Sequence, residues 1–210
     1  MRNTLLALFG ALLLLVSCNS SSKNNADAQG TVDSVVNVDS AHDARQLNEV
    51  ITRFARAYIS QDSQKANKLV HPDLGLYIIY RPGAMDTYYH ADSLDFENPV
   101  PRHYPYPTIT NDYPLSFQEL PVFDCATDQW DKQGFIADTT KNADQLTYIA
   151  EFRHEFEEVT DGELAQIKSF ERGSYRIVLT SGENLIFHVK KHEGSWYVIV
   201  IDRAYGTCDA

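Results

Sequence analysis

Residues 175–203 read YRIVLTSGENLIFHVKKHEGSWYVIVIDR, and this stretch decides the fold class. It holds three runs rich in β-branched and aromatic side chains, at residues 175–180, 185–191 and 196–203. The turn-forming segments Ser181–Asn184 and Glu193–Gly194 separate the runs. This pattern is typical of strands joined by tight turns. We therefore expect an antiparallel meander of three strands.

The last hairpin of this meander has a predictable register. If Glu193–Gly194 forms a two-residue turn, Val189 faces Val198 across the two strands, and Phe187 faces Val200. His188 and Tyr197 then share the opposite side of the sheet with isoleucine side chains. A histidine in such surroundings is either a packed interior residue or a base in a pocket.

An amphipathic helix is expected ahead of the meander, over residues 47–59. Its apolar side chains recur at three- and four-residue spacing and so share one face: Leu47, Val50, Ile51, Phe54, Ala57 and Tyr58. A short second helix should end before Pro72, because proline disfavours helical geometry at the preceding residue. A strand over residues 74–80 follows and ends in the turn Arg81–Ala84.

Two further helices are expected over residues 143–159 and 161–171. Thr160 and Glu163 have the spacing of a capping box at the start of the second helix. Before them, residues 98–121 contain six of the eight prolines, together with several tyrosines. Proline at this density excludes helix interiors and central strands. We expect a long irregular segment that packs on the rest of the domain.

The N-terminus predicts the compartment. Met1 and Arg2 precede an apolar run, Leu5–Val16, that is shorter than the roughly 20 residues of a membrane-spanning helix. Leu15-Val16-Ser17-Cys18 resembles the bacterial lipobox, which implies that residues 1–17 are a lipoprotein signal peptide and that Cys18 carries fatty-acyl chains such as palmitate. An uncleaved anchor, or a conventional signal peptide with an incidental cysteine, are the alternatives.

The segment after Cys18 predicts a tether and an address. Residues 18–44 are rich in Ser, Asn, Asp and Ala, a composition that favours a flexible tether ahead of one α+β domain, residues 45–210. Asn19 stands where an aspartate favours inner-membrane retention in enterobacterial lipoproteins, so the outer membrane is expected. The acidic cluster of surface-exported Bacteroidota lipoproteins is missing, which favours the periplasmic side.

Cysteine count and compartment together bear on a disulfide. The chain has three cysteines, and assigning Cys18 to lipid leaves Cys125 and Cys208. Thiols oxidise in the cell envelope, which favours a bond between these two. Two separate reduced cysteines are the alternative.

Composition excludes some partners and favours others. With 18 Lys and Arg against 29 Asp and Glu, the net charge of −11 argues against nucleic-acid binding. His188 and His192 are four residues apart on an expected strand, roughly 13 Å, too far to share one metal ion. No metal site, cofactor motif or catalytic constellation is predicted. The expected partners are the membrane, through the lipid, and an unidentified small molecule, glycan or protein.

The run Ile186–Ile199, with its glycine turn followed by Trp196 and Tyr197, resembles the last hairpin of NTF2-like (cystatin-like α+β) domains. The resemblance implies N-terminal helices packed on a curved antiparallel sheet that forms a cone, here with the Pro/Tyr-rich insertion. It implies a pocket, for which the candidate lining residues are Tyr80, Arg81, Tyr88, His188 and Tyr197. The expected function is non-catalytic ligand binding by a lipoprotein. The alternative is a small-molecule isomerase or hydrolase with His188 as base and Tyr80, Tyr88 or Tyr197 as hydrogen-bond donor.

Overall fold

The computed structural model describes residues 41–208, so the predicted signal peptide, Cys18 and the tether up to residue 40 lie outside the described residues. The described residues form a mixed α+β fold with four helices and nine strands. The helices are α1 (Ala41–Ile59), α2 (Ser63–Asn67), α3 (Gln145–Glu155) and α4 (Asp161–Glu171). The strands are β1 (Leu76–Tyr80), β2 (Thr87–Ala91), β3 (Leu115–Phe117), β4 (Phe123–Asp124), β5 (Gln129–Trp130), β6 (Gly134–Asp138), β7 (Ser174–Ser181), β8 (Glu183–His192) and β9 (Ser195–Asp202). No helix among them is both long and apolar enough to cross a bilayer.

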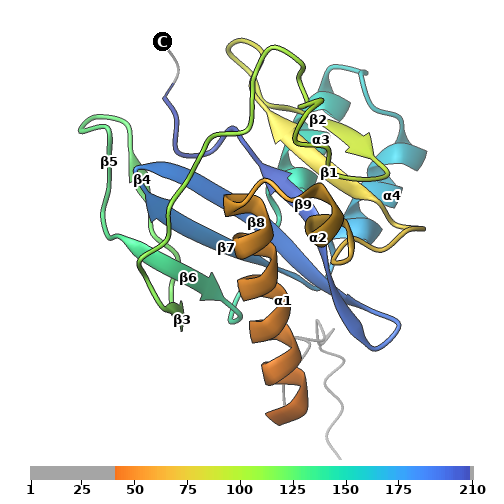
Figure 1. Cartoon of the computed structure of the whole chain (residues 1–210). Helices are drawn as coiled ribbons and strands as arrows, with labels where there is room; N and C mark the ends of the chain where they lie inside the picture. The colour runs from red at the N-terminus through yellow and green to blue at the C-terminus, as the bar shows by residue number, and fades with distance from the viewer. Residues whose placement is uncertain (1–40, 209–210) are drawn as a thin grey trace, which may run out of the picture. The chain divides into compact units, whose positions relative to one another are not determined.

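Seven strands form one sheet in the order β2-β1-β9-β8-β7-β6-β3. The predicted meander is confirmed as β7, β8 and β9, which pair antiparallel. The expected all-antiparallel sheet is nevertheless mixed, because β1 runs parallel to β9 and β3 runs parallel to β6. Parallel neighbours need a long connection between them, and the chain between β1 and β9 supplies one. Figure 1 shows α1 and α2 in front of this sheet, and α3 and α4 behind it.

The β8–β9 hairpin has the predicted turn and an unpredicted β-bulge. Glu193 and Gly194 have φ values of 48° and 84°, which are typical of a two-residue type I′ turn. Val189 pairs with Val198 as expected, but the register then shifts by one residue. His188 therefore faces Val200, and Phe187 faces Ile201 instead of Val200. A bulge of this kind is an insertion that turn geometry does not specify.

Helix α1 covers one face of the sheet with its predicted apolar side. Phe54 packs against Phe187 with the ring centroids 4.8 Å apart, in the larger of two buried apolar clusters. The helix begins earlier than expected, since residues 41–44, assigned to the tether from the sequence, already lie in it. Its first turn is held by Asp43, whose carboxylate accepts the indole N–H of Trp196 at 3.1 Å and lies 2.6 Å from the amino group of Lys191.

Helices α3 and α4 cover the other face, where Ile79, Ile199 and Val200 form part of the second apolar cluster. The capping box predicted at the start of α4 is confirmed, with Thr160 and Glu163 each binding the other's backbone N–H. Helix α3 is shorter than the predicted 143–159 and has an unpredicted cap.

That cap is the carboxylate of Glu171, at the far end of α4. It accepts the backbone N–H groups of Leu146 and Thr147 at 3.0 and 2.7 Å. Asp144, which occupies the N-cap position, makes no side-chain capping bond. Helix α3 is thus capped by a residue that only folding brings to it.

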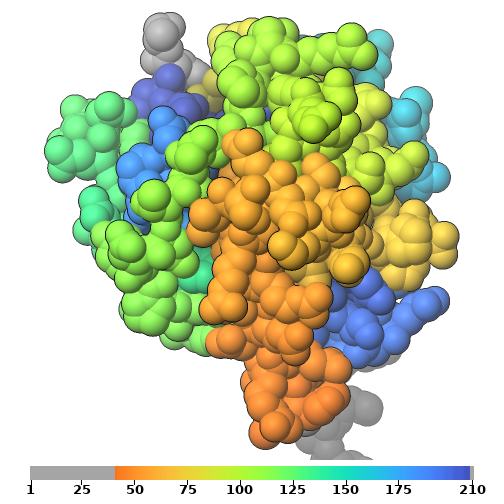
Figure 2. Space-filling model, in the orientation of Figure 1, coloured from red at the N-terminus to blue at the C-terminus, as the bar shows by residue number. Residues whose placement is uncertain are grey.

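The Pro/Tyr-rich segment, predicted to be irregular over residues 98–121, is irregular as far as Pro114, but it then contains the short edge strand β3. It packs on the domain through buried side chains, among them Tyr106, whose ring lies 6.0 Å from that of Tyr58 in α1. Figure 2 shows this yellow-green segment lying along the orange surface of α1. The segment thereby forms one wall of the region described next.

Candidate functional site

Three clefts that share lining residues lie side by side, and the middle one lies where the β1–β2 loop, the Pro/Tyr-rich segment and the residues after β9 come together. The middle cleft has a volume of about 370 Å³. It shares Pro82 and Gly83 with a cleft of about 300 Å³ beside α3. It shares Arg203 and Thr207 with a cleft of about 210 Å³ beside the β7–β8 turn. We call this row of three clefts the loop groove.

Arg81 fixes one side of the loop groove. Its Nε lies 2.6 Å from Oδ1 of Asp86, so the ion pair braces the loop between β1 and β2. Its Nη1 donates to the carbonyl of Thr207 at 3.1 Å. One guanidinium therefore holds the β1–β2 loop to the residues that follow β9.

Arg203 fixes the opposite side. Its guanidinium donates to the backbone carbonyls of Val100, Tyr104 and Pro105, all in the Pro/Tyr-rich segment. It also lies over the ring of Tyr106, 4.4 Å from the centroid. Burial lowers the pKa of this guanidinium from its ordinary value, against the opposing effect of the nearby tyrosines. The geometry is that of a clamp, because one charged side chain holds three backbone carbonyls of the irregular segment.

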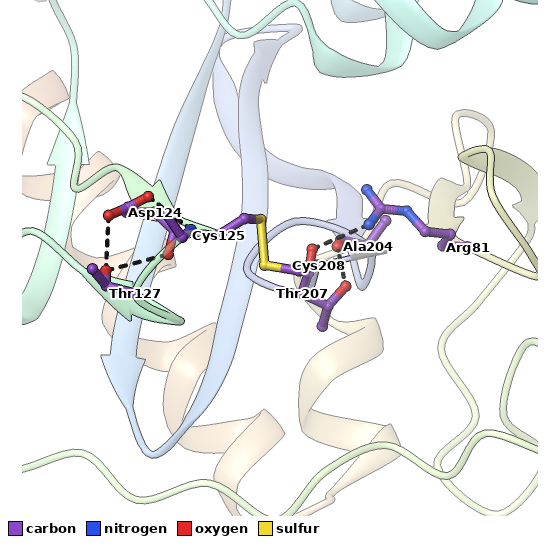
Figure 3. The surroundings of a disulfide bond; sticks show 8 residues. Arg81, Asp124, Cys125, Thr127, Ala204, Thr207 and Cys208 are labelled. Carbon is purple, nitrogen blue, oxygen red and sulfur yellow. Dashed lines mark hydrogen bonds between the residues drawn. A yellow bond between two sulfur atoms is a disulfide. The ribbon is translucent and has the colours of Figure 1, made fainter. Parts of the chain in front are cut away.

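A disulfide completes the frame, as the sequence predicted. Cys125, in the turn between β4 and β5, is bonded to Cys208, with their Cα atoms 5.5 Å apart. Figure 3 shows the bond next to Thr207, with the Arg81 guanidinium reaching toward it from the other side. Cys208 itself lines the middle cleft. Two arginine clamps and a covalent bond thus hold the walls of the loop groove in place before any ligand arrives.

Of the five pocket residues proposed from the sequence, the structure places Tyr80 and Arg81 in the loop groove. Tyr88 lies on β2, its ring 5.6 Å from that of Tyr77 and beneath the guanidinium of Arg153. Tyr197 packs against His71, with ring centroids 4.9 Å apart. Tyr88 and Tyr197 line none of the three clefts.

His188 also lies outside the loop groove, and its side chain is fully buried. Its Nδ1 is 3.2 Å from Oε1 of Glu171, close enough for an ion pair but outside hydrogen-bond geometry. Burial raises the pKa of Glu171, but His188 and Thr147 at the start of α3 lower this pKa by more, so the net shift is downward. The arrangement is that of a buried structural pair.

Most residues of the loop groove are not predictable from the sequence. Tyr104 is the most exposed aromatic ring of the middle cleft, at 50 % exposure, and Arg203 and Thr207 join two clefts. Tyr104 belongs to a segment whose composition did predict a packed excursion, but no sequence signal brings that segment to Arg203.

Charge within the loop groove is largely compensated. Asp86 pairs with Arg81, and Glu158 pairs with Arg153 at 3.0 Å. What remains available to a ligand is ring and proline surface, with polar groups at fixed positions between them. Such a surface can bind and orient a molecule. The chain matches no protein-family model, no curated protein and no solved structure.

Proposed function

We propose that the protein is a lipid-anchored, non-catalytic binding module of the cell envelope, with an NTF2-like domain whose loop groove holds a small, uncharged ligand such as a short oligosaccharide. The observation that carries this proposal is the groove itself. Its walls are fixed by Arg81, Arg203 and the Cys125–Cys208 disulfide, so little conformational entropy is lost on binding.

The size and surface of the middle cleft favour a small ligand. About 370 Å³ is at the lower end of the range for small-molecule sites. The rings of Tyr80 and Tyr104 and the side chain of Pro101 offer flat apolar surface, while Arg81 and Thr207 bring polar groups to the same cleft. A sugar ring, with one apolar face and hydroxyl groups at its edge, fits this combination.

Two observations favour binding over catalysis. The carboxylates of Asp86 and Glu158 are engaged in ion pairs, which leaves them poorly suited as general bases. His188, the base of the alternative isomerase or hydrolase, is fully buried against Glu171. The proposal therefore assigns no catalytic residue.

The anchor is proposed from the residues around Cys18. The stretch from Cys18 to Ala41, as a flexible chain, would span about 25 Å and hold the domain clear of the lipid headgroups. Several acyl chains on one cysteine give durable attachment. The disulfide supports an envelope location, because such bonds persist in oxidising compartments. We place the anchor in the outer membrane and the domain in the periplasm.

The ligand proposal is tested by screening the full chain, purified in detergent, against an array of short uncharged oligosaccharides. Tyr104→Ala should weaken the binding of any hit at least tenfold, about 1.4 kcal/mol. Tyr89→Ala is the matched control, because Tyr89 is equally exposed, at 53 % against 50 %, but lies on edge strand β2 outside the groove. An array without hits, or equal effects of the two variants, would refute the proposal.

The anchor proposal is tested by expressing Cys18→Ser and fractionating the cells. The wild-type chain should sediment with the outer membrane and carry acyl chains on an N-terminal cysteine, as read by mass spectrometry. Cys18→Ser should lose both properties. A variant that stays acylated or remains in the membrane fraction would contradict this part of the proposal.

A further inference from the structure

Three side chains with metal-binding atoms meet at the turn of the β8–β9 hairpin, at the opposite end of β8 from the loop groove. His71, His192 and Glu193 each offer one ligand atom, and these atoms all lie within 4.8 Å of one another. We propose that these three residues bind one divalent transition-metal ion, with Zn²⁺ as the reference ion.

His71 is held at this position by the fold. It follows Leu69, whose carbonyl accepts the backbone N–H of Val198 in β9 at 2.8 Å, so the connection from α2 to β1 is tied to the sheet. The His71 ring then packs edge-on against the rings of His192 and Tyr197, at 4.8 and 4.9 Å between centroids. The two histidines come from segments that are far apart in the sequence but are fixed side by side.

The nitrogen of His71 that the metal would take is Nε2, which carries the ring proton of the neutral imidazole in the metal-free protein. Its Nδ1 accepts the backbone N–H of Asp73 at 3.1 Å. A neutral imidazole that binds a metal through Nε2 carries its proton on Nδ1. Metal binding at Nε2 therefore moves the ring proton to Nδ1 and breaks the hydrogen bond that Nδ1 accepts from the Asp73 N–H.

The type I′ turn brings the third ligand. Glu193 is the first residue of the turn, and its carboxylate lies 3.9 Å from Nε2 of His192. Two ligand atoms on one tetrahedral zinc ion are about 3.3 Å apart, given metal–ligand bonds of about 2.0–2.1 Å. The Glu193 side chain is 76 % exposed, so rotation about its side-chain bonds can bring the carboxylate from 3.9 Å to the separation that zinc requires.

The donor set selects the class of ion. Two imidazoles and one carboxylate suit Zn²⁺ and neighbouring transition metals, whereas Ca²⁺ and Mg²⁺ prefer all-oxygen sites. Three protein ligands leave one position for water or a further ligand. The neighbouring lysines do not compete at the site, because the amino group of Lys190 donates to the carbonyls of Ser169 and Phe170 and that of Lys191 pairs with Asp43.

The test is zinc titration of the full chain, purified in detergent and stripped with a chelator, in competition with a chromophoric zinc indicator. We expect one Zn²⁺ per chain and no competition from Ca²⁺ or Mg²⁺. His71→Ala and His192→Ala should each weaken zinc binding by more than tenfold. Loss of a residue that only hydrogen-bonds a metal ligand already lowers metal affinity about 10–100-fold, and these variants remove a ligand itself. Zinc should also raise the melting temperature of the wild type but not of His192→Ala.

His154→Ala is the matched control. His154 also lies next to a carboxylate, with its Nε2 2.9 Å from Oδ1 of Asp161, but this pair has no second histidine beside it. Glu193→Gln changes only an exposed turn side chain and keeps the test valid if an alanine variant misfolds. Absence of zinc binding to the wild type would overturn the proposal. So would zinc affinity that is unchanged in both single variants, Glu193→Gln and His192→Ala, or a loss of affinity in His154→Ala as large as in His192→Ala.

Discussion

Replacing Glu171 with alanine should destabilise the protein more than any change on its surface. The Glu171 carboxylate is 1 % exposed and accepts the backbone N–H groups of Leu146 and Thr147 at the start of α3. Alanine leaves both N–H groups without this partner. A buried N–H group that loses a charged acceptor lowers the free energy of unfolding, because no water molecule takes the place of that acceptor.

The magnitude follows from the contacts. Each hydrogen bond to a charged group contributes about 1.5–3 kcal/mol, and Glu171 accepts two of them. Since these contributions overlap in one side chain, we expect the free energy of unfolding to fall by about 4 kcal/mol. For a chain of this size, that corresponds to a melting temperature lower by about 8–16 °C.

Urea unfolding, followed by circular dichroism, measures the difference. Asp144→Ala is the control, because Asp144 occupies the N-cap position of α3 but makes no side-chain capping bond. It should cost no more than about 0.5 kcal/mol, from the helix dipole alone. A loss below about 1 kcal/mol in Glu171→Ala, or a larger loss in Asp144→Ala, would refute the assignment of Glu171 as the cap.

Two further predictions concern the disulfide and pH. Replacing both Cys125 and Cys208 with serine should lower the free energy of unfolding by about 2–4 kcal/mol, because the bond closes a loop of sequence separation 83; dithiothreitol should produce the same loss in the wild type and none in the double variant, as measured by urea unfolding. The pKa of Glu171 is lowered in the folded state, so its ionisation stabilises the fold fully above the unfolded pKa, and this contribution is lost as the pH falls through the folded pKa. Between about pH 6 and pH 3, wild-type stability should therefore fall more steeply than that of Glu171→Gln; parallel stability curves would contradict the shift.

Features that depend on neighbouring residues were predictable from the sequence. The β7–β8–β9 meander follows from composition and turns, the start of α4 follows from the Thr160–Glu163 spacing, and the irregular segment follows from its prolines. The disulfide was predictable by elimination, since assigning Cys18 to lipid left one pair of cysteines.

Features that depend on distant residues were not predictable. The cap of α3 comes from Glu171, although Asp144 stands in the expected position. The bulge in β9 shifts His188 opposite Val200, and nothing in the alternation of side chains marks where an extra residue enters. The loop groove needs Arg203 to meet the Pro/Tyr-rich segment, which is a consequence of the complete fold.

The position of β9 has a consequence for how the chain acquires its structure. This strand lies between β8 and β1, and it is the last strand of the described residues. The β1–β2 hairpin is synthesised early, yet its place in the sheet does not exist until residues 195–202 have been made. Such long-range parallel pairing closes late in folding. The β1–β2 hairpin should therefore stay unassembled until residues 195–202 have left the ribosome.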